Sequence, residues 1–297
     1  MDHLTLAVPV WLTALYPFKP QSFTTPSGAR MSYIDEGPRS NEAVLMLHGN
    51  PTWSFYYREL VQAVSPTMRC VAPDHIGMGL SEKPQDYAYT LATRIADVEA
   101  LVTALGLTKI HLVVHDWGGA IGFGFAVRHP QLIGRITILN TAAFTSTRIP
   151  GRIAICKAAG IGPLLVRGLN GFAWPATWMS MNRRSLTSDE KRAFIFPYNS
   201  WTNRVAVSAF VQDIPLDASH SSWSTLDAIE RGVPQFANRP VSIFWGGKDF
   251  CFNDHFLSRW RELLPNASVE RIADAGHYVL ADAREQVIPR VTAFLTR

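Results

Sequence analysis

The residues most suited to chemistry lie in the segment Val113–Gly118, which reads VVHDWG. The apolar run Lys109–Val114 is typical of a short buried strand, and the glycines from Gly118 onward are typical of a closely packed helix. Asp116 therefore falls in a sharp strand-to-helix turn, a position that can present a nucleophile. A carboxylate there can attack a saturated carbon, become esterified, and be released when water attacks its own carbonyl carbon. The alternative is a structural aspartate that caps the following helix.

Two later residues could complete a catalytic triad in the chain order nucleophile, acid, histidine. His277 lies in the sequence DAGH, between the last predicted strand and the last predicted helix. Asp249 lies in the sequence WGGKD, directly after the predicted strand Val241–Trp245. An acid at this strand end could hold the imidazole in one tautomer and stabilise its protonated form. Asp254 is the reserve candidate for the acid, and a structural turn aspartate is the alternative for Asp249.

The loop His48–Pro51, with the sequence HGNP, follows the predicted strand Ala43–Leu47. We expect the backbone N–H groups of Asn50 and Trp117 to form an oxyanion hole above Asp116. The side-chain amide of Asn50 and the indole N–H of Trp117 add two neutral donors, which suit a departing halide. A simple turn is the alternative interpretation of this loop.

The elements that must position these residues alternate between strand and helix patterns. Apolar residues repeat at 3.6-residue spacing from Leu91 to Leu105, which predicts a helix ending at Gly106. This alternation predicts the α/β class, with a mostly parallel sheet covered by helices on both faces. A final helix is expected through Val287–Leu295, although Pro289 is awkward inside it. The predicted strands are Arg30–Asp35, Ala43–Leu47, Met68–Ala72, Lys109–Val114, Arg135–Leu139, Val241–Trp245 and Ser268–Ile272.

The alternation lapses in the middle of the chain, where helical patterns rich in tryptophan and broken by prolines replace it. Because the strand pattern resumes afterwards, we predict a helical cap inserted into one core domain. The predicted core covers residues 1–143 and 232–297, and the predicted cap covers residues 144–231. A second hydrophobic domain is the alternative.

Composition limits the classes of function. The chain has 297 residues, a formal charge of +4 and no run of Lys and Arg, which argues against a nucleic-acid partner. Its three cysteines are far apart and indicate reduced core thiols rather than disulfides or a metal site. No uncharged apolar run approaches the length of a membrane span, and the N-terminus lacks a basic leader segment. We therefore predict a cytoplasmic protein without a membrane partner. The oligomeric state stays open.

Five motifs together resemble the haloalkane dehalogenase family, whose members have the α/β-hydrolase fold. They are HGNPTWSFYYR, APDHIGMGLSEKP, VVHDWGG, WGGKD and AGH. The resemblance covers nearly the whole chain and is weakest around residues 145–190. It implies that Asp116 is the nucleophile and His277 the general base. It also implies that Asn50 and Trp117 stabilise the halide.

Some members of that family place the catalytic acid, a glutamate, after the sixth strand. Here that strand ends in Leu139–Asn140, and a neutral asparagine cannot serve as the anionic partner. The acid therefore falls on Asp249, so the chain resembles the subfamily that combines an Asp–His–Asp triad with an Asn–Trp halide site. The cap tryptophans Trp174 and Trp178 are then expected to be pocket walls or core.

The resemblance implies an enzyme that hydrolyses haloalkanes to an alcohol and halide through a covalent ester on Asp116. Its partners would be a small apolar halogenated substrate, water and the halide product, with neither metal nor organic cofactor. An epoxide hydrolase is one alternative, but that family uses two cap tyrosines and residues 141–230 contain only Tyr198. A fluoroacetate dehalogenase would need arginines beside the nucleophile, where this chain has Trp117. A non-catalytic protein that binds a small molecule on the same fold is the alternative from another class.

Overall fold

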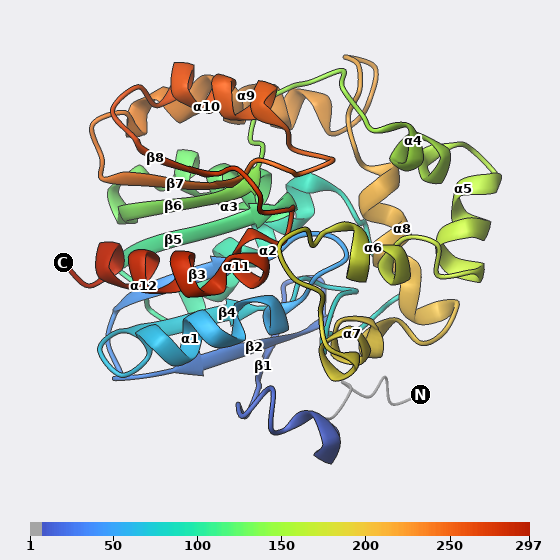
Figure 1. Cartoon of the computed structure of the whole chain (residues 1–297), viewed down its shortest axis with the longest axis horizontal. Coiled ribbons are helices and arrows are strands. Elements are labelled where there is room, and N and C mark those ends of the chain that lie inside the picture. The colour runs from blue at the N-terminus through green and yellow to red at the C-terminus, as the bar shows by residue number, and fades with distance from the viewer. Residues whose placement is uncertain (1–7) are drawn as a thin grey trace.

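A computed structural model describes residues 8–297 and shows one eight-stranded sheet with helices on both faces (Figure 1). The strand order is β1-β2-β4-β3-β5-β6-β7-β8. The first two strands run antiparallel to their neighbours, and the other six are parallel to one another. The predicted α/β class is confirmed, and β1 is the one strand that the sequence analysis missed. The strands are β1 Gln21–Thr24, β2 Arg30–Glu36, β3 Glu42–Leu47, β4 Arg69–Pro73, β5 Lys109–Asp116, β6 Ile133–Thr141, β7 Val241–Gly246 and β8 Ser268–Ile272.

Two hydrophobic cores lie on opposite faces of the sheet. Successive side chains of a strand point to opposite faces, so Val44 of β3 packs into one core and Leu45 into the other. This double burial explains why the central strands are continuous apolar runs. One core is covered by α1 Arg58–Val64, α11 Val279–Asp282 and α12 Arg284–Leu295. The other is covered by α2 Leu91–Ala104, α3 Trp117–Arg128, α9 Trp223–Gly232 and α10 Asp254–Leu263.

The ends of two helices test the sequence predictions. Helix α2 begins after Thr90, whose hydroxyl accepts a hydrogen bond from the Thr93 N–H, and the chain leaves the helix before Gly106, which has a positive φ. Both ends agree with the prediction. Helix α12 begins at Arg284, three residues before the predicted start, so Pro289 lies inside it. The helix therefore does not begin late enough to place that proline in its first turn.

The segment between β6 and β7 lies beyond the carboxyl ends of the parallel strands, at the right of Figure 1. Its last α-helix, α9, returns to the sheet and packs against α2 and α3. The division of the chain at residues 144 and 231 stays a prediction, and residues 1–7 of the predicted core lie outside the described residues. The other α-helices of the segment are α4 Gly151–Lys157, α5 Ile161–Pro163, α6 Ala173–Met179, α7 Ser188–Ile195 and α8 Val205–Gln212. Its shorter turns are the π-helical η4 Leu164–Gly168 and the 3-10 helices η5 Phe196–Tyr198, η6 Thr202–Arg204 and η7 Val233–Phe236.

Within residues 8–297, all three cysteines are unpaired, and no group of three potential metal ligands comes together. None of the helices in this part of the chain is both long enough and apolar enough to cross a bilayer. The predicted cytoplasmic location stays a prediction.

Candidate active site

Asp116 ends β5 and immediately precedes α3, with the unusual backbone angles φ 52° and ψ −129°. Glycine is required opposite this turn, because a Cβ atom on Gly49 would lie 2.1 Å from the Asp116 Oδ1 atom. The Thr141 hydroxyl donates to the Asp116 carbonyl and ties the turn to the end of β6. Turns of this kind usually have the pattern Gly-x-nucleophile-x-Gly. Here Val114 takes the place of the first glycine, and Gly122 on α3 leaves room for its side chain. Asp116 therefore has the unusual backbone angles expected of a residue in such a turn, although only the second of the two usual glycines is present.

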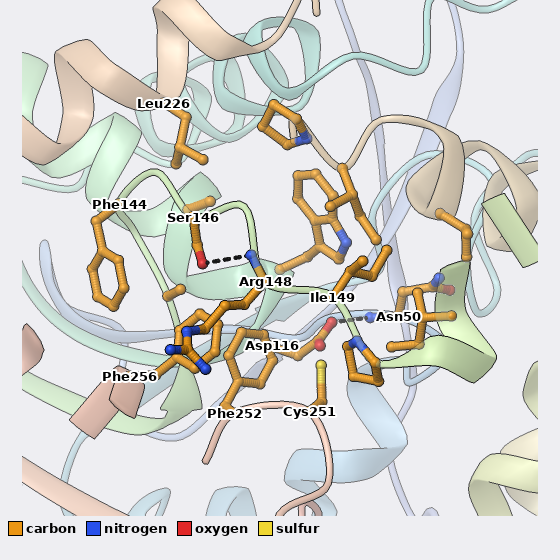
Figure 2. Close-up of a pocket in the computed structure, with 18 of the residues that line it drawn as sticks. Asn50, Asp116, Phe144, Ser146, Arg148, Ile149, Leu226, Cys251, Phe252 and Phe256 are labelled. Carbon is orange, nitrogen blue, oxygen red and sulfur yellow. Dashed lines mark hydrogen bonds between the residues drawn. The ribbon is translucent and has the colours of Figure 1, made fainter. Parts of the chain in front are cut away.

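The Asp116 carboxylate is buried and faces the backbone of the HGNP loop. The Asn50 N–H donates to Asp116 Oδ1 over 2.7 Å (Figure 2). Burial raises the pKa of Asp116 above its ordinary value, although the positive charge on His277 and the N–H groups of Asn50 and Trp117 act in the opposite direction. The two amides predicted for an oxyanion hole thus both lie at the candidate nucleophile.

The structure also brings His277 and Asp249 to Asp116. His277 Nδ1 lies 2.7 Å from Asp249 Oδ2, and His277 Nε2 lies 3.6 Å from Asp116 Oδ2. Burial lowers the pKa of His277, but the neighbouring carboxylates of Asp249 and Asp116 outweigh it, and the pKa is raised. The second Asp249 oxygen accepts from the N–H groups of Cys251 and Phe252, which fixes the carboxylate in place.

The reserve acid is not part of this cluster. Asp254 lies at the start of α10, where its exposed carboxylate forms an ion pair with Arg271 over 2.7 Å. Asn140, at the position where some dehalogenases carry the acid, instead exchanges two hydrogen bonds with the Gly246 backbone. It links the ends of β6 and β7 and so supports the loop that carries Asp249.

The two predicted leaving-group donors come from different elements beside Asp116, Asn50 from the HGNP loop and Trp117 from the start of α3. The Asn50 amide nitrogen donates one hydrogen to the Val207 carbonyl over 3.1 Å, which leaves its second hydrogen available. The Trp117 ring packs against Phe210 and lines the same cavity as Asp116. Both donors therefore border the space into which a leaving group would move.

Two apolar cavities meet at Asp116. The first, shown in Figure 2, extends toward α9 and α10, and the second extends between α4 and α6. The second is larger, about 320 Å³ against about 120 Å³. Both are lined by Asn50, Asp116, Ile153, Phe172 and Cys251. A substrate atom at Asp116 could therefore carry one apolar chain into each cavity.

Most of the residues that line the cavities were not predicted from the sequence, and two tryptophans lie elsewhere than predicted. Trp174 and Trp178 were predicted to be pocket walls or core, and this prediction is wrong, because they are 57% and 44% exposed and line neither cavity at Asp116. The buried face of α6 consists of small residues, Ala173, Ala176 and Thr177. This small-residue face was the sequence signal that could have oriented the helix.

Three further buried histidines support the site without facing the cavities. His115 Nε2 lies 3.0 Å from the His277 carbonyl oxygen, so it braces the loop that carries His277. His75 donates its backbone N–H to His48 Nε2, which holds the start of the HGNP loop. Burial lowers the pKa of all three and brings that of His48 to about 4, so they stay neutral at ordinary pH.

Comparisons with known proteins support the fold described above. A family model described as an alpha/beta hydrolase fold matches residues 42–283. The cis-3-alkyl-4-alkyloxetan-2-one decarboxylase of Shewanella oneidensis is 45% identical over 291 residues, which cover 96% of this chain and 91% of that protein. Haloalkane dehalogenase 2 of Mycobacterium tuberculosis is 27% identical over 275 residues, which cover 92% of this chain and 93% of that protein.

The crystal structure of a haloalkane dehalogenase from Bradyrhizobium elkani superimposes with a TM-score of 0.84 and 24% sequence identity. The match covers 94% of this chain and 97% of that one. The predicted resemblance is confirmed. However, the 45% relative carries the name of a decarboxylase, an activity that the sequence analysis did not consider.

Proposed function

Because the chain belongs to the α/β-hydrolase family and to the family of the Shewanella oneidensis decarboxylase, we propose that it converts a cis-3-alkyl-4-alkyloxetan-2-one into an alkene and carbon dioxide. Such a substrate is a four-membered lactone with two neighbouring alkyl chains. The observation that carries the proposal is the meeting of two apolar cavities at a buried carboxylate, Asp116. A haloalkane with a single chain would fill one cavity, whereas a dialkyl lactone would fill both.

In the first step, an Asp116 oxygen attacks ring carbon C4 and forms a C–O bond with inversion. The bond from C4 to the ring oxygen breaks, and its electron pair leaves on that oxygen, which becomes part of a carboxylate on C3. This carboxylate takes the place of a departing halide. The amide of Asn50 and the indole of Trp117 border the cavity where its charge develops, so they would stabilise the transition state.

In the second step, the bond between C3 and the carboxylate breaks and its electron pair forms the C3–C4 double bond. Carbon dioxide leaves, and the bond from C4 to Asp116 breaks, which regenerates the Asp116 carboxylate. No water is consumed. Inversion followed by elimination of antiperiplanar groups gives a cis alkene from a cis lactone. The apolar cavity walls favour this step, because a poorly solvated carboxylate loses carbon dioxide more readily than a hydrated one.

Haloalkane hydrolysis is the second candidate, and the position of His277 favours it. His277 Nε2 lies 3.6 Å from Asp116 Oδ2, close enough to activate a water molecule against an ester on Asp116. Asp249 would stabilise the imidazolium that forms. The epoxide hydrolase alternative has less support, because the Tyr198 hydroxyl donates to the Thr52 carbonyl and does not line either cavity.

We expect Asn50→Ala and Trp117→Phe each to lower kcat/KM for the lactone about 10- to 100-fold, since each removes one donor to a developing charge. The aromatic ring of Phe preserves the packing of position 117 against Phe210. Steady-state kinetics on both variants test this expectation. Activity within twofold of the parent enzyme for both would rule out their role in charge stabilisation.

The two candidate reactions should differ in their pH dependence. Haloalkane hydrolysis needs neutral His277, and the pKa of this histidine is raised above its ordinary value of 6.5. The rate of hydrolysis should therefore rise with pH, with a midpoint above 6.5, and vanish at acidic pH. Lactone decarboxylation needs ionised Asp116, so it should persist to lower pH and fall only as that carboxylate takes up a proton. Rate–pH profiles for a lactone and a bromoalkane check this, and superimposable profiles would contradict it.

Parallel assays test the proposed function itself. The enzyme should release alkene from a cis-3,4-dialkyl oxetan-2-one with a much higher kcat/KM than it releases bromide from 1-bromobutane or diol from styrene oxide. Preference for the bromoalkane would favour the second candidate instead. Tight binding of the lactone without any turnover would favour the non-catalytic binding protein.

A further inference from the structure

The outer surface of the cap is apolar over a continuous stretch of chain. We call this surface the cap face and define it as the exposed residues from Gly151 to Trp178 on α4, α5, η4, α6 and the turns between them. Arg152 is its only charged or polar member. The others are Gly151, Ala154, Ile155, Ala158, Ala159, Gly160, Ile161, Leu164, Gly168, Leu169, Gly171, Trp174 and Trp178. Six of these side chains are large, apolar and exposed within one short segment, which gives this face the character of a binding surface.

The cap face is the outer side of the helices whose inner side lines the cavities. On α4, Ile153 and Cys156 line the larger cavity, while Ile155 points outward and is exposed. On α6, Ala176 lines that cavity, while Trp174 and Trp178 are exposed. The wall between the cavity and the cap face is therefore one helix thick.

Residues of the cap face also line the larger cavity. Exposed Arg152 of α4 and half-buried Met179 of α6 both line the cavity, and the Arg152 guanidinium lies 3.3 Å from the Met179 sulfur. These two residues bridge the gap between α4 and α6. An apolar molecule that entered or left between these helices would therefore cross the cap face.

The chain segment that carries the cap face has charged residues of one sign only. No Asp or Glu occurs between Thr141 and Asp189, whereas Arg and Lys occur six times in that interval. At one edge, a surface hollow is lined by Arg183, Arg184 and Lys191, with Trp178 in its wall. Arg183 and Arg184 are paired with acidic residues, but within the described residues the Lys191 side chain has no such partner. This hollow can therefore accept an added anionic group.

We propose that the cap face docks on a phospholipid bilayer that contains anionic headgroups. Tryptophan and aliphatic side chains would enter the interfacial region, and Lys191 with Arg152 would meet lipid phosphates. Docking on a bilayer differs from the prediction, made from the sequence, that the protein has no membrane partner. Together with the proposed function, docking explains how a lactone with two alkyl chains, which partitions into lipid, reaches the larger cavity directly from the bilayer.

Vesicle co-sedimentation tests the docking. The protein should bind vesicles of phosphatidylcholine with phosphatidylglycerol, and bind much less well to phosphatidylcholine alone or at high salt. The double variant Trp174→Ser, Trp178→Ser should weaken binding at least about tenfold, because two interfacial side chains are lost. The double variant Arg152→Gln, Lys191→Gln should weaken binding to anionic vesicles about tenfold, because each charge contributes to attraction at the surface.

Matched controls lie away from the cap face. Val10→Ser removes an exposed apolar side chain, and Lys109→Gln removes a charge at the start of β5, so both should bind vesicles like the parent protein. Parental binding by both double variants would overturn the proposal. Sedimentation velocity provides a second test. If the parent protein self-associates and the tryptophan variant does not, the cap face joins two copies of this chain, and the proposal is overturned.

The experiments can contradict the docking proposal without contradicting the proposed function, and the reverse. Vesicle binding does not depend on turnover, so it survives if the chain is not a decarboxylase. If both proposals hold, the tryptophan variant should keep its kcat/KM on a short-chain, water-soluble lactone, because neither tryptophan lines the cavities. It should lose activity only on a long-chain lactone presented in anionic vesicles. Equal loss on both substrates would show that these tryptophans act on the site rather than on lipid.

Discussion

Replacing Asp116 with alanine should abolish alkene formation from the lactone and halide release from a bromoalkane, with a fall of at least about 1,000-fold in kcat for each. The reason is that both proposed reactions begin with a bond to the same carboxylate oxygen. Asp116 is buried at the junction of the two cavities, and among residues 8–297 no other carboxylate lines either of them. Gas chromatography of the alkene and a bromide assay measure the two losses.

The fold should survive the change, because the Asp116 side chain accepts a hydrogen bond but fills no part of either hydrophobic core. Thermal unfolding followed by circular dichroism verifies this, and Asp116→Asn provides an isosteric second variant. Asp254→Ala is the matched control, since it removes an exposed carboxylate paired with Arg271 and should leave both activities intact. Parental activity in folded Asp116→Ala would contradict every mechanism proposed for this site.

Replacing His277 with alanine should separate the two reactions. Decarboxylation through fragmentation of the ester consumes no water, so alkene formation should fall by no more than about tenfold. Haloalkane hydrolysis needs a base to activate water, so bromide release should stop after one turnover and leave an alkylated Asp116. Mass spectrometry of the intact variant after incubation with a bromoalkane would detect the adduct.

Asp249→Asn is the partner experiment, because it keeps the shape of the side chain next to His277 Nδ1 but removes its charge. It should slow hydrolysis far more than decarboxylation. If His277→Ala instead lost both activities to the same extent, the histidine would take part in the lactone reaction as well. The water-free route would then be wrong, even with Asp116 as the nucleophile.

Much of the fold was predictable from local patterns. The central parallel strands, such as β3 and β5, are buried on both faces and appear in the sequence as continuous apolar runs, and the ends of α2 are marked by Thr90 and Gly106. Strand β1 was not predictable in this way, because it is a short edge strand whose burial pattern is mostly exposed. Without a buried face, a strand has no alternating or continuous hydrophobic signal.

The proposed triad was predictable because its residues follow strand ends, and the carboxyl ends of parallel strands meet at one edge of the sheet. The cavity walls were not, because they come from cap segments whose orientation depends on tertiary packing. Trp174 and Trp178 show the difficulty, since a large aromatic residue in a helix is usually buried but here faces outward. The preference between lactone and haloalkane was also hidden, because the same motifs position Asp116 for both.

Product analysis of one substrate tests the central claim most directly. The purified enzyme would be incubated with a cis-3,4-dialkyl oxetan-2-one, and the products followed by proton NMR beside Asp116→Ala. We expect the parent enzyme to convert the lactone to the cis alkene and carbon dioxide, while the variant leaves it unchanged. A β-hydroxy acid as the main product would instead mean that Asp116 serves hydrolysis, and the trans alkene would contradict inversion followed by antiperiplanar elimination.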